Sequence, residues 1–175
     1  MKISLDALEV LADRYAALAE EKEAAASGEA KERYRLMKDT LKKVPRHGAD
    51  DLFEAIQSFI LIWQTMCLEQ TPNPFAFSVG NADRIFEPYR AKTNMSREVA
   101  ASLFKHLLVF FNVADRSWAI SQNLIIGGKS NEGEDLTNPT SYALLDAYYD
   151  MNLPQPILSV KLHKNTPKEL YESLG

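Results

Sequence analysis

The residues that come closest to a catalytic set lie on one face of a predicted strand near the C-terminus. Three polar residues alternate there with three apolar ones: Ser159, Lys161 and His163 with Leu158, Val160 and Leu162. This alternation is typical of a half-buried strand. If the polar face lines the interior of a barrel, its hydroxyl, ammonium and imidazole groups could meet a substrate. If a helix covers that face, the same groups only form hydrogen bonds, and the sequence leaves both interpretations open.

A second stretch, NLIIGGKS at residues 123–130, ends like a phosphate-binding loop. The opening glycine of that motif should fall at residue 123, where asparagine stands, and Ile125 and Ile126 would occupy the tight loop. The pattern therefore argues against nucleotide binding. The acidic residues that follow lack the alternating ligands and glycine placement of a calcium loop, so we interpret them as solvated surface: Glu132, Glu134 and Asp135.

The remaining titratable residues also have structural interpretations. Cys67 lies inside an apolar helical stretch, which favours buried packing over a nucleophile. Asp83 and Glu87 are four residues apart on a helical face, and we expect them to bond to Arg84 and Arg90. Three histidines and one cysteine argue against a zinc site. No nucleophile, base and orienting group can be assembled from spacing alone, so no catalytic residue is assigned.

The composition bounds the class of protein and its partners. A chain of 175 residues has room for one domain with a sizeable core. Its net charge of −4 argues against nucleic acid or an anionic membrane surface as a partner. The longest apolar run, Phe59 to Trp63, is too short to cross a bilayer. A single cysteine forms no internal disulfide, and together with the absence of a signal peptide it favours a cytoplasmic protein.

The elements that would position these residues follow from hydrophobic periodicity and turn signals. Helices are predicted at residues 4–26, 29–43, 51–69, 96–115, 140–151 and 167–173. Strands are predicted at residues 75–79, 123–126 and 157–162. The fold class is therefore α/β, with a helical hairpin at residues 1–48 and a partial parallel α/β unit of order βαβαβα at residues 49–175.

Several packing expectations accompany this assignment. The first helix has an apolar stripe of Leu8, Leu11, Tyr15 and Leu18. The helix at 51–69 is apolar on nearly every side, so we expect it to be buried all round. Three parallel strands leave two open edges, which predicts pairing with more chain or with a second copy, and hence a dimer or larger species. Thr166 to Glu169 reads as a capping box that starts a last helix, after which the chain ends.

Four stretches resemble the glycyl-radical enzymes related to pyruvate formate-lyase. DDLFEAIQSF (50–59) resembles a buried helix of that family, and FAFSVGNADRIFEPY (75–89) resembles a segment with the pattern Ser-x-Gly-Arg-x-Asp. SQNLIIGGKSNEGEDLTNPTSYALLDA (121–147) resembles a segment with Gln-Asn, Gly-Gly and a Thr-Asn helix start. PILSVKLHKNTPKEL (156–170) resembles Pro-x-Leu-Ser-Val-Arg-x-His followed by Asn-Thr-Pro. The order and spacing of all four make the resemblance specific to the superfamily.

This resemblance implies a ten-stranded α/β barrel that encloses a glycyl-radical loop and a catalytic cysteine. Such enzymes make or break C–C, C–O, C–N or C–S bonds under anaerobic conditions, as lyases, dehydratases or formate C-acetyltransferases. A separate radical S-adenosylmethionine activase installs the radical, so the parent enzyme would need that partner. No cofactor is assigned to this chain itself.

Departures from the family pattern are informative. The family's catalytic cysteine and radical glycine lie downstream of the segment that HKNTP (163–167) resembles, and this chain ends before either. Cys67 is in the wrong segment, and no Arg-Val-x-Gly-Tyr stretch is present. Asn81 and Lys161 stand where the family usually has arginine. We therefore expect a central segment of a larger enzyme that is inactive alone.

The resemblance also suggests a substrate pocket. The positions that match pocket-lining residues of the family are Phe75, Ala76, Ser121, Gln122 and Asn123. Phe75 and Ala76 carry no charge, so no carboxylate clamp is visible there. Two other functions stay open: a stand-alone binding or regulatory module that kept the scaffold and lost the chemistry, and an interaction subunit whose open sheet edge pairs with a partner.

Overall fold

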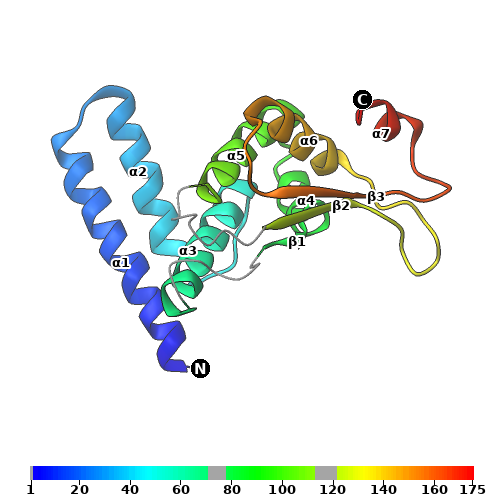
Figure 1. Cartoon of the computed structure of the whole chain (residues 1–175). Helices are drawn as coiled ribbons and strands as arrows, with labels where there is room; N and C mark the ends of the chain where they lie inside the picture. The colour runs from blue at the N-terminus through cyan, green and yellow to red at the C-terminus, as the bar shows by residue number, and fades with distance from the viewer. Residues whose placement is uncertain (1, 71–77, 113–121) are drawn as a thin grey trace. The chain divides into compact units, whose positions relative to one another are not determined.

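The computed structural model of the chain describes residues 2–70, 78–112 and 122–175 (Figure 1). Two compact units are present, residues 1–66 and residues 67–175, and each is described by itself. The first consists of helices and the second contains the sheet. The domain boundary expected after residue 48 stays a prediction.

The first unit is built from helices α1 (Lys2–Ala25) and α2 (Gly28–Lys43) and most of α3 (Leu52–Gln70). These agree with three of the predicted helices. Small and aliphatic side chains form the core of this unit: Leu8, Ala12, Ala16, Leu41 and Leu61. Ion pairs join α1 to the residues after it, from Lys38 Nζ to Glu23 Oε2 at 2.6 Å and from Arg46 to Glu9 and Asp13 at 3.0 Å each.

Two packing expectations for this unit are wrong. The stripe on α1 is rotated, because alanines let the helix approach its neighbours closely while Tyr15 and Leu18 are 47% and 45% exposed. Helix α3 is not buried all round. Three of its apolar side chains are exposed, in the second half of the helix: Ile62, Met66 and Leu68.

The second unit contains a three-stranded sheet in the order β1-β2-β3. Strands β1 (Gly80–Asn81), β2 (Asn123–Gly127) and β3 (Ile157–Lys161) are all parallel, which confirms the predicted strand direction. Only the end of the first predicted strand is tested: residues 75–77 lie outside the described residues, residues 78 and 79 are not in a strand, and β1 begins at Gly80.

Four helices belong to this unit: α4 (Ala82–Lys92), α5 (Arg97–Phe110), α6 (Pro139–Met151) and α7 (Lys168–Glu172). The observed order is therefore βααβαβα, because α4 is a further helix that lies outside the predicted helix ranges, although Asp83 and Glu87 were expected on a helical face. Pro88 lies inside α4, although a proline at an interior position usually interrupts a helix. The helix start predicted at Asn138-Pro139 is confirmed, since Asn138 accepts from the backbone N–H groups of Thr140 and Ser141.

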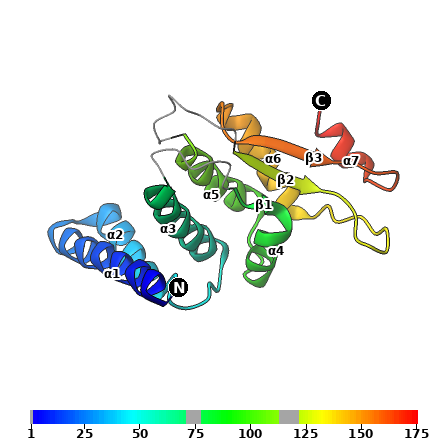
Figure 2. The same cartoon turned by 60° about the horizontal axis from the view of Figure 1, so that its bottom comes forward.

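The sheet has two different faces. Leu124 and Ile126 are 1% and 0% exposed, and this face is packed by helices, with α4 against β2 and α6, and α5 against α6 (Figure 2). The strand alternation places seven residues on the opposite side, which we call the open face: Asn81, Asn123, Ile125, Gly127, Ile157, Ser159 and Lys161. No described strand or helix of the second unit is seen to cover this face in either view.

The predicted capping box at Thr166 is wrong. Helix α7 begins at Lys168 after Pro167, and no side chain caps it. Thr166 Oγ1 instead accepts from the backbone N–H of His163 at 2.8 Å, and the Thr166 N–H donates to the His163 carbonyl at 3.0 Å. The Thr166 hydroxyl closes the turn after β3. Because it accepts from the nearby His163 N–H, it does not cap the first turn of α7.

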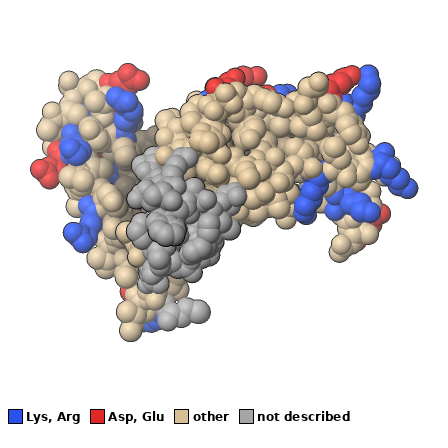
Figure 3. Space-filling model, in the orientation of Figure 1, with Lys and Arg blue, Asp and Glu red and all other residues tan. Residues whose placement is uncertain are grey.

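The surface carries charges of both signs. On the face drawn in Figure 3, basic and acidic side chains are interspersed, and no broad basic surface is seen among the described residues. None of the described helices is both long enough and apolar enough to span a membrane.

Candidate functional site

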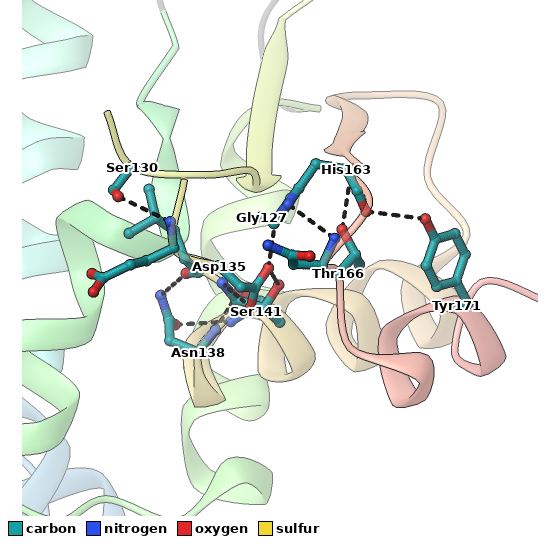
Figure 4. A network of polar contacts seen from close by, with 12 residues as sticks. Gly127, Ser130, Asp135, Asn138, Ser141, His163, Thr166 and Tyr171 are labelled. Atoms are coloured by element: carbon teal, nitrogen blue, oxygen red, sulfur yellow. Dashed lines mark hydrogen bonds and ion pairs between the residues drawn. The ribbon is translucent and has the colours of Figure 1, made fainter. Parts of the chain in front are cut away.

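The carboxyl ends of the three parallel strands bring together the residues that could do chemistry. Asn81, Gly127 and Lys161 are the last residues of β1, β2 and β3. In sheets of this kind, ligands bind beyond the carboxyl ends of the strands. Figure 4 shows a network of polar side chains just beyond the ends of β2 and β3. This network and the open face are the two candidate places for a functional site.

Two polar pairs cross the strands on the open face. Asn123 Nδ2 donates to Ser159 Oγ at 2.9 Å, and Lys161 Nζ donates to Asn81 Oδ1 at 3.4 Å. Asn123 Oδ1 is buried and accepts no hydrogen bond in the described part of the chain. Amide, hydroxyl and ammonium groups can bind and orient a polar molecule. The three strands carry no carboxylate or imidazole, so this face offers binding and no acid–base pair.

Only part of the pocket expected from the sequence is described. Phe75, Ala76 and Ser121 lie outside the described residues. Gln122 is 6% exposed, and its backbone is fixed by the Gln155 side chain at 3.0 Å and by the Ile157 N–H at 2.8 Å. Asn123 is on the open face. The role of all five residues in substrate binding stays a prediction.

His163 lies beyond β3 and bonds to a carboxylate. Its Nδ1 accepts from the backbone N–H of Asn165 at 3.3 Å, which leaves the proton on Nε2, and Nε2 donates to Asp135 Oδ1 at 2.9 Å. Asp135 also accepts from the backbone N–H and hydroxyl of Thr137. Both ring nitrogens are therefore occupied, and the pair clamps the loop after β2 to the turn after β3 (Figure 4).

This geometry separates His163 from the other two polar residues of the predicted strand face. The imidazole is hydrogen-bonded and does not lie in the strand with Ser159 and Lys161, because β3 ends at Lys161. The interpretation of Asp135 as solvated surface is wrong, since its side chain is only 19% exposed and holds three donors. Sequence reasoning missed this contact because 28 residues separate its two partners.

Asp83 joins three elements beneath the strand ends. The residue is fully buried, and its Oδ2 accepts from the Gly127 N–H at 2.6 Å and from Ser141 Oγ at 2.7 Å. Its Oδ1 accepts from the Arg84 N–H at 2.8 Å. Burial raises the pKa of Asp83, although these hydrogen bonds oppose the shift. The expected pairing with an arginine side chain is wrong here, because Asp83 points into the core instead.

Glu87 lies one turn further along α4 and does pair with an arginine, as expected. Arg90 Nε and Nη2 donate to its two carboxylate oxygens at 2.8 and 2.7 Å, and Thr140 Oγ1 donates at 2.7 Å. Burial alone would raise the pKa of Glu87, but the hydrogen bonds from Arg90 and Thr140 outweigh it and lower the pKa. Asp83 and Glu87 together anchor the first turn of α6 to α4.

The single thiol and the glycines of this chain are not arranged as a radical-bearing glycine beside a reactive cysteine. Cys67 is half-buried in α3, and burial raises its pKa. At Gly127 and Gly128, the atoms nearest to a Cβ position belong to Lys161, Leu170 and Thr137, and the other five glycines have no neighbouring atom within 4 Å of that position. No cluster of three or more potential metal-ligating residues occurs in the described ranges.

Comparison with known proteins identifies the family. The chain matches the pyruvate formate lyase-like family along residues 1–175. Trans-4-hydroxy-L-proline dehydratase of Clostridioides difficile is 28% identical over 186 residues, which cover 97% of this chain and 23% of that protein. (2S)-3-sulfopropanediol dehydratase of Klebsiella oxytoca is 26% identical and covers 97% of this chain and 22% of its own length.

Solved structures agree. A glycyl radical enzyme from Archaeoglobus fulgidus superposes with a TM-score of 0.88 at 27% identity, over 97% of this chain and 24% of that one. The glycerol-bound B12-independent glycerol dehydratase from Clostridium butyricum gives a TM-score of 0.85 at 29% identity, over 95% and 23%. The chain thus spans about a quarter of the length of these relatives. It belongs to the pyruvate formate lyase-like family, whose members include the glycyl radical enzymes.

Proposed function

We propose that this chain forms part of the barrel wall of a glycyl radical enzyme that eliminates water or another leaving group from a small polar molecule. The open face of the parallel sheet carries this proposal, because it presents two polar pairs, one between the start of β2 and the middle of β3 and one at the carboxyl ends of β1 and β3. The relatives support the reaction class, since two of them are dehydratases and another is an isethionate sulfite-lyase.

In this proposal the open face binds and orients the substrate. Asn123 and Ser159 already share one hydrogen bond, and the unpaired Asn123 Oδ1 can accept from a substrate hydroxyl once that atom becomes accessible. Gln122 and the flanking residues Phe75, Ala76 and Ser121 would complete the pocket. Asp83 and Glu87 act at a distance by holding the strand ends and α6 in position.

The radical chemistry would come from outside these 175 residues. The thiol and glycines of this chain do not form a radical pair, so we propose that it has no lyase activity alone. The partners of the whole enzyme would be the remainder of its own barrel, a radical S-adenosylmethionine activase in the cytoplasm, and further copies of itself.

Electron paramagnetic resonance tests whether this chain can carry a glycyl radical by itself. The 175-residue chain, incubated anaerobically with an activase and S-adenosylmethionine, should give no glycyl doublet. A doublet from this polypeptide alone would contradict the proposal.

Ligand titration tests the binding role. With ¹⁵N-labelled chain and glycerol, NMR shifts should be saturable at Asn123, and Ser159→Ala should weaken them. Ser173→Ala is the matched control, because Ser173 follows α7 and its Oγ donates to the Glu169 carbonyl, away from the open face. Equal effects of both variants would argue against the open face as the binding surface.

A further inference from the structure

One polar contact on the open face crosses all three strands. Lys161 Nζ, from β3, donates to Asn81 Oδ1 of β1. Strand β2 lies between these two strands, so the lysine side chain passes over the end of β2. Lys161 is the only charged residue of the three strands, and it forms no ion pair with any residue in the described ranges.

Two glycines at the end of β2 make room for this crossing. Gly127 is the register partner of Lys161. A Cβ at Gly128 would lie 3.3 Å from Lys161 Cβ and 3.4 Å from Lys161 Cδ, so the aliphatic part of the lysine lies directly against this glycine. Gly128 also has a φ of +99°, which residues with side chains rarely adopt. The position of the ammonium therefore depends on the glycine pair.

The Asn81 side chain is free for a second role. Asn81 is the N-cap residue of α4, and asparagine is a preferred capping residue, yet its side chain forms no capping bond. Its Oδ1 accepts from Lys161, while its Nδ2 group donates to no residue in the described part of the chain. An ammonium and an amide N–H group are thus available side by side at the carboxyl end of the sheet.

We propose that Lys161 and Asn81 form a subsite for the anionic group of a small substrate, such as a carboxylate or a sulfonate. This inference rests on the function proposed above. An ammonium enclosed in a barrel without a counter-charge is costly, and an anionic substrate group supplies that charge. Lysine offers three donors to an oxyanion, and charge-assisted hydrogen bonds of this type are strong.

The test compares two small ligands of similar size, glycolate and ethylene glycol, by NMR on the ¹⁵N-labelled chain without any radical. Glycolate should give saturable shifts at the Asn81 side-chain amide and at Gly128, and ethylene glycol should bind at least about tenfold more weakly. Lys161→Met, which keeps the aliphatic length, should remove this preference. Lys164→Met, an exposed lysine in the following turn, should leave it unchanged.

Each other outcome overturns the subsite. The subsite is refuted if glycolate and ethylene glycol bind with equal affinity, or if Lys161→Met binds glycolate as the wild type does. It is also refuted if the Asn81 side-chain amide shows no saturable shift. Shifts that equal concentrations of chloride reproduce would indicate an adventitious ion only, which also overturns it. If both ligands shift Asn123 and Ser159 but not Asn81, the subsite fails while the open face still binds substrate. If neither pair responds, both proposals fail.

Discussion

Replacing Asp83 with asparagine should destabilise the sheet end, although the two side chains have the same size. The carboxylate accepts from three donors, two on Oδ2 and one on Oδ1. An amide has only one acceptor atom. Whichever way the asparagine turns, its NH₂ group must face at least one of the N–H groups of Arg84 and Gly127. The substitution therefore places a donor against a donor inside the core.

The size of the effect follows from what is lost. An unsatisfied buried donor costs about 1–3 kcal/mol, so Asp83→Asn should lower the free energy of unfolding of this unit by about that amount. Asp83→Ala leaves both the Gly127 N–H and the Ser141 hydroxyl without their acceptor, and we expect roughly 2–4 kcal/mol. Both variants also remove a buried carboxylate. Because burial disfavours the ionised form of Asp83, this removal offsets part of the loss in the free energy of unfolding.

Native-state hydrogen exchange at the Gly127 amide measures this directly, because that amide donates to Asp83. Exchange should accelerate about 5- to 100-fold in Asp83→Asn, whereas the exposed control Asp6→Asn should leave it unchanged. Since burial raises the folded-state pKa of Asp83, the wild type should lose stability as the pH rises from about 4 through that pKa. Unchanged exchange, or the same pH dependence in Asp83→Asn, would refute the reasoning.

Four further predictions concern other parts of the chain. Glu87→Gln should cost roughly 1–2 kcal/mol at pH 7, and because the folded-state pKa of Glu87 is lowered, the wild-type advantage should vanish as the pH falls through that pKa in urea unfolding curves. Gly128→Ala should destabilise by about 1–3 kcal/mol in thermal melts, and more than Gly133→Ala, which shares the positive φ but has open space around it. His163→Ala should release the loop after β2 and speed exchange at the Leu136 amide, while Ser173→Ala should not. Light scattering at micromolar concentration should show a dimer or larger species, because apolar side chains of α3 are exposed, and a clean monomer would count against this.

Local sequence signals predicted those helices and strands whose residues interact with near neighbours in the sequence. The alternation of β3 and the Asn138-Pro139 start of α6 are of this kind, and both are confirmed. The same signals failed where one residue had two uses. Pro88 usually ends a helix, yet it is accommodated within α4. Thr166 has the spacing of a helix cap, but its hydroxyl accepts from the closer His163 N–H.

The candidate site was less predictable because its contacts are remote in sequence. Asp83 bonds to Gly127 and Ser141, which follow it by 44 and 58 residues in the sequence. Hydrophobic periodicity is a local pattern and does not predict such contacts. Asp135 looked like surface because its neighbours are acidic and polar, although a histidine 28 residues later covers it. The family resemblance did single out the two residues of the proposed subsite, since Asn81 and Lys161 both stand where the family usually has arginine, and they lie in contact.

The central claim is that the open face of the sheet lines the substrate cavity. A crystal structure of the complete enzyme with its substrate bound tests this most directly. The account predicts substrate atoms within hydrogen-bond distance of Asn123 or Ser159, with any anionic group of the substrate at Lys161. A structure in which protein side chains cover the open face and the substrate lies elsewhere would contradict it.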